Sequence, residues 1–373
     1  MHNLNTIKFF YIFIFTISVT LSCKPKKQDD PAPVVVVVPI GNPTPPAVIY
    51  SGNKQNMLDA DLRLAMFESL IEYTQTGNTK GVFVDSVKLK NMFYNISNPF
   101  DTAYLNVSGL NIADAVDPAY KTEIEKLFGK LSVASKSQVE SSDGFAGVKQ
   151  ASTTSSFKLY DTKGIAIYEL IEKQLMGSLQ LYQICSVLLA ENNLKNQTKE
   201  IRLQTWDKAF AYLGLTPDFL NYKITKPGLP FWGEYFGLND DRLGTNVSKI
   251  MNSFISGRSS IEANNEARVL ENAQTIRIEL SRTAAGMALT YLRRTRLNII
   301  NSDLTRRNSA FSEGIGFLKG LRSHPEKKIN SAILDGIILD LGTSSWEMSD
   351  TTKIVKAYNS LANSYYLDAK NFN

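Results

Sequence analysis

The side chains that most often carry catalysis are scarce in this chain, which has 2 His and 2 Cys among 373 residues. His2 lies in the N-terminal segment, and His324 precedes Pro325 in a stretch that predicts a surface turn. One histidine supplies no imidazole pair for zinc, and the sequence has no HExxH, GxSxG or glycine-rich phosphate loop. The sequence therefore predicts no catalytic residues of these classes.

Carboxylates are the remaining candidates for metal binding or acid–base chemistry. Glu169 and Glu172 are three residues apart, so they share one helix face beside Lys173. Asp207 follows Trp206 in a helical segment, and we expect it at the margin of the core. These three carboxylates are candidate metal ligands, although an ion-paired or solvated helix face is the simpler interpretation. The sequence names no cofactor.

Three other groups have structural interpretations. Asn239–Asp241 carries oxygen ligands but lacks the spacing of a calcium loop, so we expect a solvated turn. Cys185 lies in an apolar segment and is expected to be a buried small hydrophobe. Seven arginines could bind phosphate, carboxylate or lipid headgroups, and an exposed helix face paired with glutamates is the favoured alternative. They are Arg277, Arg282, Arg293, Arg294, Arg296, Arg306 and Arg307.

The N-terminal segment predicts export. Residues 1–22 combine Lys8 with an apolar core from Phe9 to Leu21, which is typical of a signal peptide and too short to cross a bilayer. Cys23 follows a small residue as in a bacterial lipobox, although Thr20 stands where Leu is usual. We expect lipid attachment at Cys23 and membrane anchoring through it. Ordinary cleavage with an incidental Cys is the alternative.

The residues after Cys23 predict an exposed tether. Lys24–Asp30 is basic and then acidic, and it resembles the surface-export signal of some Gram-negative lipoproteins. Prolines bracket Val34–Val38 and oppose a strand there, so residues 23–48 are expected to form an extended spacer. The predicted location is the outer membrane, facing outward, with a periplasm-facing protein as the alternative.

Residues 49–373 predict an all-α domain, either one large helical bundle or two packed bundles. Residues 132–156 and 214–245 are expected to be loops, Gly286 is a candidate bend, and no segment predicts a convincing sheet. Met57–Tyr73 places Leu58, Leu62, Met66 and Leu70 on one apolar stripe. The expected helices span residues 57–73, 87–93, 120–131, 164–193, 199–213, 246–255, 261–300, 309–321, 329–341 and 351–369.

Composition narrows the classes of partner. Apolar residues make up 43% and charged residues 21% of the chain, as in ordinary globular proteins. The net charge of +5 is small for this length, so nucleic acid is not an expected partner. Two cysteines build no disulfide framework.

Several strings, in order, resemble the lipoprotein domain-of-unknown-function family 4856, from about residue 48 to 370. Among them are Tyr50-Ser51-Gly52, Asn98-Pro99-Phe100, Trp206–Tyr212, Phe254–Arg258 and Ser312–Phe317. The family is similar in setting to imelysin-type helical lipoproteins, and this resemblance implies an imelysin-like helical fold and an association with iron or haem acquisition. The chain has Gln204-Thr205 where members often carry two histidines, and it lacks the imelysin GxHxxE string, so no peptidase activity is transferred.

Two functions follow as expectations. The preferred one is a surface-anchored, non-enzymatic module that binds a ligand or partner, as an accessory to iron or haem uptake through an outer-membrane receptor. The alternative is an imelysin-like metal-dependent hydrolase or metal-binding protein that uses Glu169, Glu172 and Asp207. A purely structural envelope protein is a third possibility.

Overall fold

The computed structural model describes residues 49–150, 156–221, 230–243 and 246–368. Residues 45–373 form one compact unit, and every buried core side chain of the described ranges belongs to it. The expected signal peptide, Cys23 and the tether lie outside the described residues. Because the compact unit has its own core, we expect residues 45–373 to fold without the N-terminal segment.

Helices dominate the described ranges, which confirms the all-α prediction. Side-chain oxygens cap the starts of six of them, and the capping residues are Asn53, Asp85, Thr198, Asn265, Asp303 and Asn330. The first helices are α1 (Lys54–Gln75), η1 (Thr76–Asn78), α2 (Ser86–Tyr94), α3 (Ala103–Asn106), α4 (Lys121–Ser135), α5 (Ile167–Leu175), η2 (Met176–Leu188), α6 (Glu191–Leu194) and α7 (Lys199–Ala211). The later ones are η3 (Phe219–Asn221), α8 (Trp232–Leu243), α9 (Asn246–Glu262), α10 (Glu266–Ile300), α11 (Leu304–Leu321), α12 (Ser331–Leu341) and α13 (Thr352–Ser364).

A short sheet corrects the prediction that residues 132–156 form a loop. Residues 132–135 complete α4, and β1 (Gly147–Gln150) pairs antiparallel with β2 (Phe157–Tyr160), Gly147 opposite Tyr160. Leu159 and Tyr160 are buried, so packing of β2 against the helices stabilises strands too short to stand alone.

The apolar segment expected as one helix over 164–193 is helical only from Ile167, changes type, and is interrupted at residues 189–190. It runs as α5 to Leu175, continues as the π-helix η2 to Leu188 and ends with α6. The 13-residue π-helix is unusual, because π-helix normally appears as a single turn. Apolar periodicity alone does not distinguish the two helix types.

Two loop and boundary predictions in the C-terminal half were also wrong. Residues 232–243, expected as loop, form α8, where Trp232, Tyr235 and Phe236 are almost fully buried. Residues 261–300 do not form one helix, because α9 ends at Glu262 and α10 begins at Glu266; Gly286 lies inside α10. Burial of the three aromatic rings stabilises α8 despite its interior glycines.

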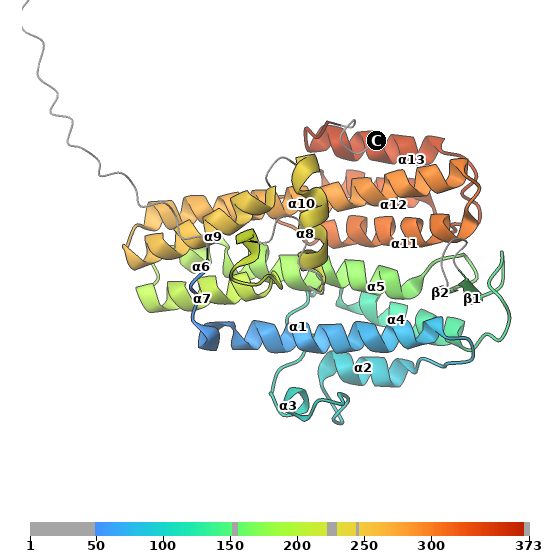
Figure 1. The fold of residues 1–373 in the computed structure, drawn as a ribbon, viewed down its shortest axis with the longest axis horizontal. Coiled ribbons are helices and arrows are strands. Elements are labelled where there is room, and N and C mark those ends of the chain that lie inside the picture. Colours follow the sequence, from blue (N-terminus) through green and yellow to red (C-terminus); the bar gives the residue numbers. More distant parts are fainter. Residues whose placement is uncertain (1–48, 151–155, 222–229, 244–245, 369–373) are drawn as a thin grey trace, which may run out of the picture. The chain divides into compact units, whose positions relative to one another are not determined.

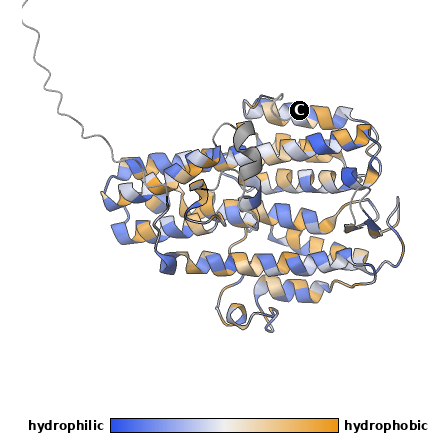
Figure 2. Cartoon of the chain, in the orientation of Figure 1, coloured by the Kyte–Doolittle hydropathy of each residue, from blue (hydrophilic) through white to orange (hydrophobic). Residues whose placement is uncertain are grey.

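The apolar stripe expected on α1 was partly wrong. Met66 and Leu70 are buried, but Leu58 is exposed and Leu62 is half-buried. Residues spaced by four rotate by about 40° per step around a helix of 3.6 residues per turn, so four such residues leave the buried face. Figure 2 shows hydrophobic and hydrophilic residues distributed along most helices.

Helix α5 is central to the packing. It contacts α11 on one side and α1 and α4 on another, while α10 packs against α9, α11 and α13 (Figure 1). The approach of the central helix to α11 is close: a Cβ at Gly177 would lie 2.2 Å from the Gly320 Cα, and one at Gly316 would lie 2.7 Å from the Lys173 Cβ. Gly177 of η2 and Gly316 and Gly320 of α11 therefore allow the two helices to approach closely, and Gly316 leaves room for the side chain of Lys173.

Candidate functional site

A group of charged side chains lies buried between α5 and α11. This α5–α11 ion cluster consists of Glu169, Glu172 and Lys173 on α5 and Glu313 on α11, all less than 10% exposed. Lys173 Nζ lies 2.7 Å from Glu172 Oε1 and 3.6 Å from Glu169 Oε2. Lys158 Nζ of β2 lies 2.6 Å from Glu169 Oε1. The ion-paired interpretation of Glu169 and Glu172 is confirmed, and the solvated one was wrong.

Burial and charge separate the pKa values of the three carboxyls. Burial alone would raise the pKa of Glu169, but Lys173 and Lys158 together hold it below its usual value. Burial and the neighbouring Glu169 raise the pKa of Glu313 to about 7, and burial likewise raises the pKa of Glu172. Burial would lower the pKa of Lys173, but Glu172 and Glu169 raise it. The cluster thus holds Lys173 charged and favours a protonated Glu313 at acidic pH.

The geometry of the ion cluster does not resemble a metal site. An ammonium group, Lys173 Nζ, occupies the position between the carboxylates of Glu169 and Glu172. Within the described ranges, no three His, Cys, Asp or Glu side chains lie together in an arrangement that could hold a metal ion. The carboxylates are therefore neutralised by cations of the protein itself.

Asp207 of α7 is fully buried, which corrects its expected position at the margin of the core. Among the described residues, none of the hydrogen bonds that its carboxylate accepts involves a residue of the ion cluster. Its carboxylate accepts hydrogen bonds from Tyr50 Oη (2.6 Å), the Asn53 backbone N–H (3.0 Å), Asn56 Nδ2 (2.8 Å) and Arg258 Nε (2.9 Å). Four donors occupy its two oxygens, so Asp207 joins the N-terminal segment of the body to α9. Trp206, by contrast, is buried as predicted.

His324 is fully buried, so the expectation of a surface turn residue was wrong. Its Nδ1 accepts a hydrogen bond from the Glu326 backbone N–H. Burial, together with nearby Lys327 and Arg277, lowers the pKa of His324 to about 3, so the imidazole is neutral. Cys185 is a buried free cysteine, as predicted, and burial raises its pKa. Neither side chain lines the pocket described below.

The remaining polar candidates have structural roles. Asn239–Asp241 belongs to α8, so the expected turn was wrong. Arg277 pairs with Glu326 and Arg282 with Glu279, as predicted, but both arginines are half-buried, so the expected exposed face was wrong for them. Arg307 differs, because it is buried and donates to Asn308 Oδ1 and the Met348 carbonyl.

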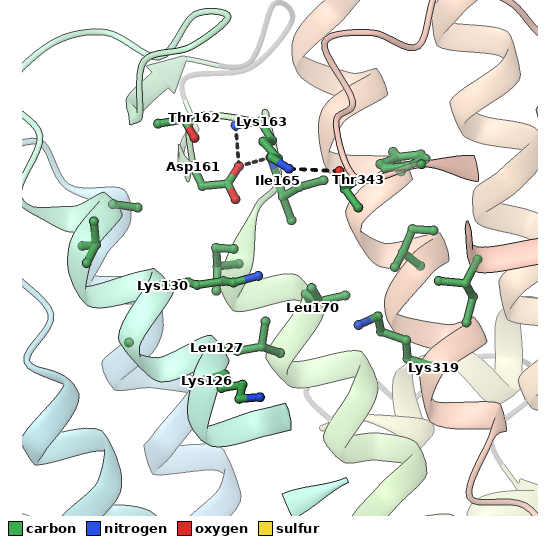
Figure 3. Close-up of a pocket in the computed structure, with 18 of the residues that line it drawn as sticks. Lys126, Leu127, Lys130, Asp161, Thr162, Lys163, Ile165, Leu170, Lys319 and Thr343 are labelled. Carbon is green, nitrogen blue, oxygen red and sulfur yellow. Dashed lines mark hydrogen bonds between the residues drawn. The ribbon is translucent and has the colours of Figure 1, made fainter. Parts of the chain in front are cut away.

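An open pocket lies between α4, α5, α11 and α12. This α4–α12 pocket has a volume of about 1070 Å³, at the upper end of the range for small-molecule sites. Its floor is apolar, and Lys126 and Lys130 of α4 lie along one side while Lys319 of α11 lies on the other (Figure 3). The floor residues are Leu127, Ile165, Ile167, Leu170, Phe311 and Ile315. The pocket thus presents an apolar surface bordered by lysines.

Sequence patterns did not identify this pocket. Its walls come from four segments that are up to about two hundred residues apart, and no short motif marks them. Lys126 and Lys130 stand four residues apart beside Leu127, a spacing that places both ammonium groups on one helix face. That spacing is a weak signal, because solvated helix faces have it as often.

Fold and site together define an all-α protein with a buried ion cluster and a separate apolar pocket. The chain belongs to the family of the domain of unknown function DUF4856, whose model matches residues 53–336. This match confirms the family resemblance, over a shorter range than expected. No curated protein and no solved structure matches the chain.

Proposed function

We propose that this chain is a surface-anchored helical lipoprotein that acts as a non-enzymatic ligand-binding module. The α4–α12 pocket is the observation that supports this proposal. The body already has its own packed core, so the apolar floor of the pocket is left available to a ligand. Lipid attachment at Cys23 and an extended spacer over residues 23–48 would hold this body at the outer membrane. Among the described residues, no helix combines the length and apolar composition that crossing a membrane requires.

An accessory role in iron or haem acquisition is the specific form of this proposal that the family resemblance suggests. Metal analysis and thermal shift of residues 45–373 with ferric iron, haem, zinc and calcium test it. Stoichiometric metal, or a clear shift with haem, supports this form. A blank with all four contradicts it and leaves the pocket as a site for another ligand.

Gly129 of α4 allows a sharp test of the pocket itself. It lines the pocket, and a Cβ added there meets no atom within 4 Å. Gly129→Trp therefore adds a large side chain to the pocket wall at a position where its Cβ meets no atom, while Gly129→Ala adds only a methyl group. We expect the neutral probe N-phenyl-1-naphthylamine to bind residues 45–373 and Gly129→Ala saturably, and to lose binding in Gly129→Trp. Equal binding to all three proteins, or to none, contradicts the proposal.

One observation favours the alternative, an imelysin-like hydrolase or a metal-binding protein. The raised pKa values of Glu172 and Glu313 in the ion cluster are typical of acid–base sites. However, neither residue lines the α4–α12 pocket, and Lys173 lies among the carboxylates. Loss of a measured hydrolase activity in Glu313→Gln, with unchanged folding, would support the alternative.

A further inference from the structure

The α4–α12 pocket combines an apolar floor with a basic rim. Leu127, Leu170 and Phe311 contribute apolar surface at its base. Val133 and Leu339 also line it, and both are more than two-thirds exposed. Large apolar side chains with this exposure are more stable when a ligand covers them. The apolar lining of the pocket therefore suits a hydrocarbon body.

Cationic side chains outnumber carboxylates around the same pocket. Lys126, Lys130, Lys163, Lys319 and Arg322 line it, against Asp161 and Asp335. Both oxygens of Glu123 are engaged by Lys319 and Arg322, and Asp335 lies 3.7 Å from Arg322 Nη1. Those two cations are thus neutralised within the protein.

The other three cations form no ion pair among the described residues. Asp161, which lines the same pocket, attracts Lys130 and Lys163 electrostatically without pairing directly with either. Lys163 Nζ donates to the neutral Thr343 Oγ1 at 3.0 Å. Asp161 Oδ1 accepts the backbone N–H groups of Lys163 and Ile165, both at 2.9 Å, which fixes the turn that carries Lys163.

Lys130 stands beside the apolar floor, with Lys126 toward one end of the pocket and Lys163 toward the other in the view of Figure 3. In Figure 3, Lys130 of α4 extends across the pocket toward the side of α11, and Leu170 of α5 lies beneath, between Lys130 and Lys319. An acidic group placed above Leu170 would face the ammonium groups of Lys126, Lys130 and Lys163 against the single carboxylate of Asp161. Ammonium and carboxylate or phosphate groups form charge-assisted hydrogen bonds in such a geometry.

We propose that the α4–α12 pocket binds an amphipathic anion, with its hydrocarbon body on the apolar floor and its acidic head at Lys130, which has Lys126 on one side and Lys163 on the other. This inference rests on the proposed function and specifies its ligand class. A fatty-acid carboxylate and a lysophospholipid phosphate share the required chemistry. The volume of about 1070 Å³ is ample for one long acyl chain.

Displacement of N-phenyl-1-naphthylamine from residues 45–373 tests the ligand class. The competitors are oleate, oleoyl lysophosphatidic acid, the neutral oleyl alcohol and the cationic hexadecyltrimethylammonium. We expect both anions to bind at least about tenfold more tightly than the alcohol, and the anion affinity to fall at high salt. The tighter of the two anions identifies carboxylate or phosphate as the preferred head. Equal affinity for anion and alcohol, or a preference for the cation, overturns the inference.

Lysine variants test the position of the acidic head. Lys126→Ala/Lys130→Ala removes two exposed, unpaired charges, so the fold is retained, and we expect oleate affinity to fall about tenfold with probe affinity unchanged. The matched control is Lys54→Ala/Arg296→Ala, two exposed cations outside the pocket, which leaves oleate affinity unchanged. Equal losses in both variants overturn the inference. If the protein binds the probe but shows no preference for anions, this inference fails while the proposed ligand-binding function stands. If the protein does not bind the probe, the proposed function fails as well.

Discussion

Removing the carboxylate of Asp207 should destabilise the body strongly. Asp207 is fully buried and accepts four hydrogen bonds, one of them from the guanidinium of Arg258. Breaking a buried ion pair by removing one partner costs about 3–5 kcal/mol. Arg258 also pairs with Glu262 and its side chain is 14% exposed, so it retains some compensation. We therefore expect Asp207→Ala to cost about 4 kcal/mol.

The assay is reversible urea and thermal unfolding of residues 45–373, read by circular dichroism. A loss of about 4 kcal/mol corresponds to a Tm lower by about 6 °C in a chain of this size. Tyr50→Phe removes one of the four donors and leaves the charge pair, so it should cost about 1–2 kcal/mol. A stability of Asp207→Ala within about 1 kcal/mol of the unchanged protein would refute the structural role of Asp207.

Three other substitutions have directions that the structure fixes. The pKa of Glu313 is raised to about 7 in the folded protein, so its proton-linked stabilisation is complete below about pH 4.5 and is lost as the pH rises through about 7. The stability of Glu313→Gln relative to the unchanged protein should therefore rise by up to about 3 kcal/mol between pH 4.5 and 8 in urea unfolding, and a constant difference would contradict this. Gly129→Ala should stabilise α4 by about 0.5–1 kcal/mol in the same assay, because the new Cβ meets no atom within 4 Å. A loss of stability would show that the space beside Gly129 is not open. Gly177→Ala should cost about 3 kcal/mol, because its Cβ would lie 2.2 Å from the Gly320 backbone, and a neutral effect would show that the two helices can separate.

Helices were predictable because their apolar residues repeat at three- and four-residue spacing. The π-helix η2 was not, because it buries the same residue types as an α-helix and differs in hydrogen bonding. Helix α8 was missed because local glycine and proline signals predict a loop, while burial of Trp232 and Phe236 is a tertiary effect.

The candidate site was predictable only in part. Glu169, Glu172 and Lys173 are neighbours in sequence, so their pairing could be anticipated. Glu313 joins them from α11, which the sequence does not indicate. Asp207 is buried beside Tyr50, which is 157 residues away in the sequence. His324 is buried by packing over its turn, which the residues of the turn themselves do not indicate. Long-range packing decides all three.

Binding of an amphipathic anion in the α4–α12 pocket can be located on the chain itself. The experiment is photo-crosslinking of residues 45–373 with a diazirine-bearing oleate analogue, followed by peptide mass mapping. We predict labelled peptides from α4, the segment 161–170 and α11, with labelling suppressed by excess oleate and in Gly129→Trp. Labels on α1, α7 or α9 that persist in Gly129→Trp would contradict the claim.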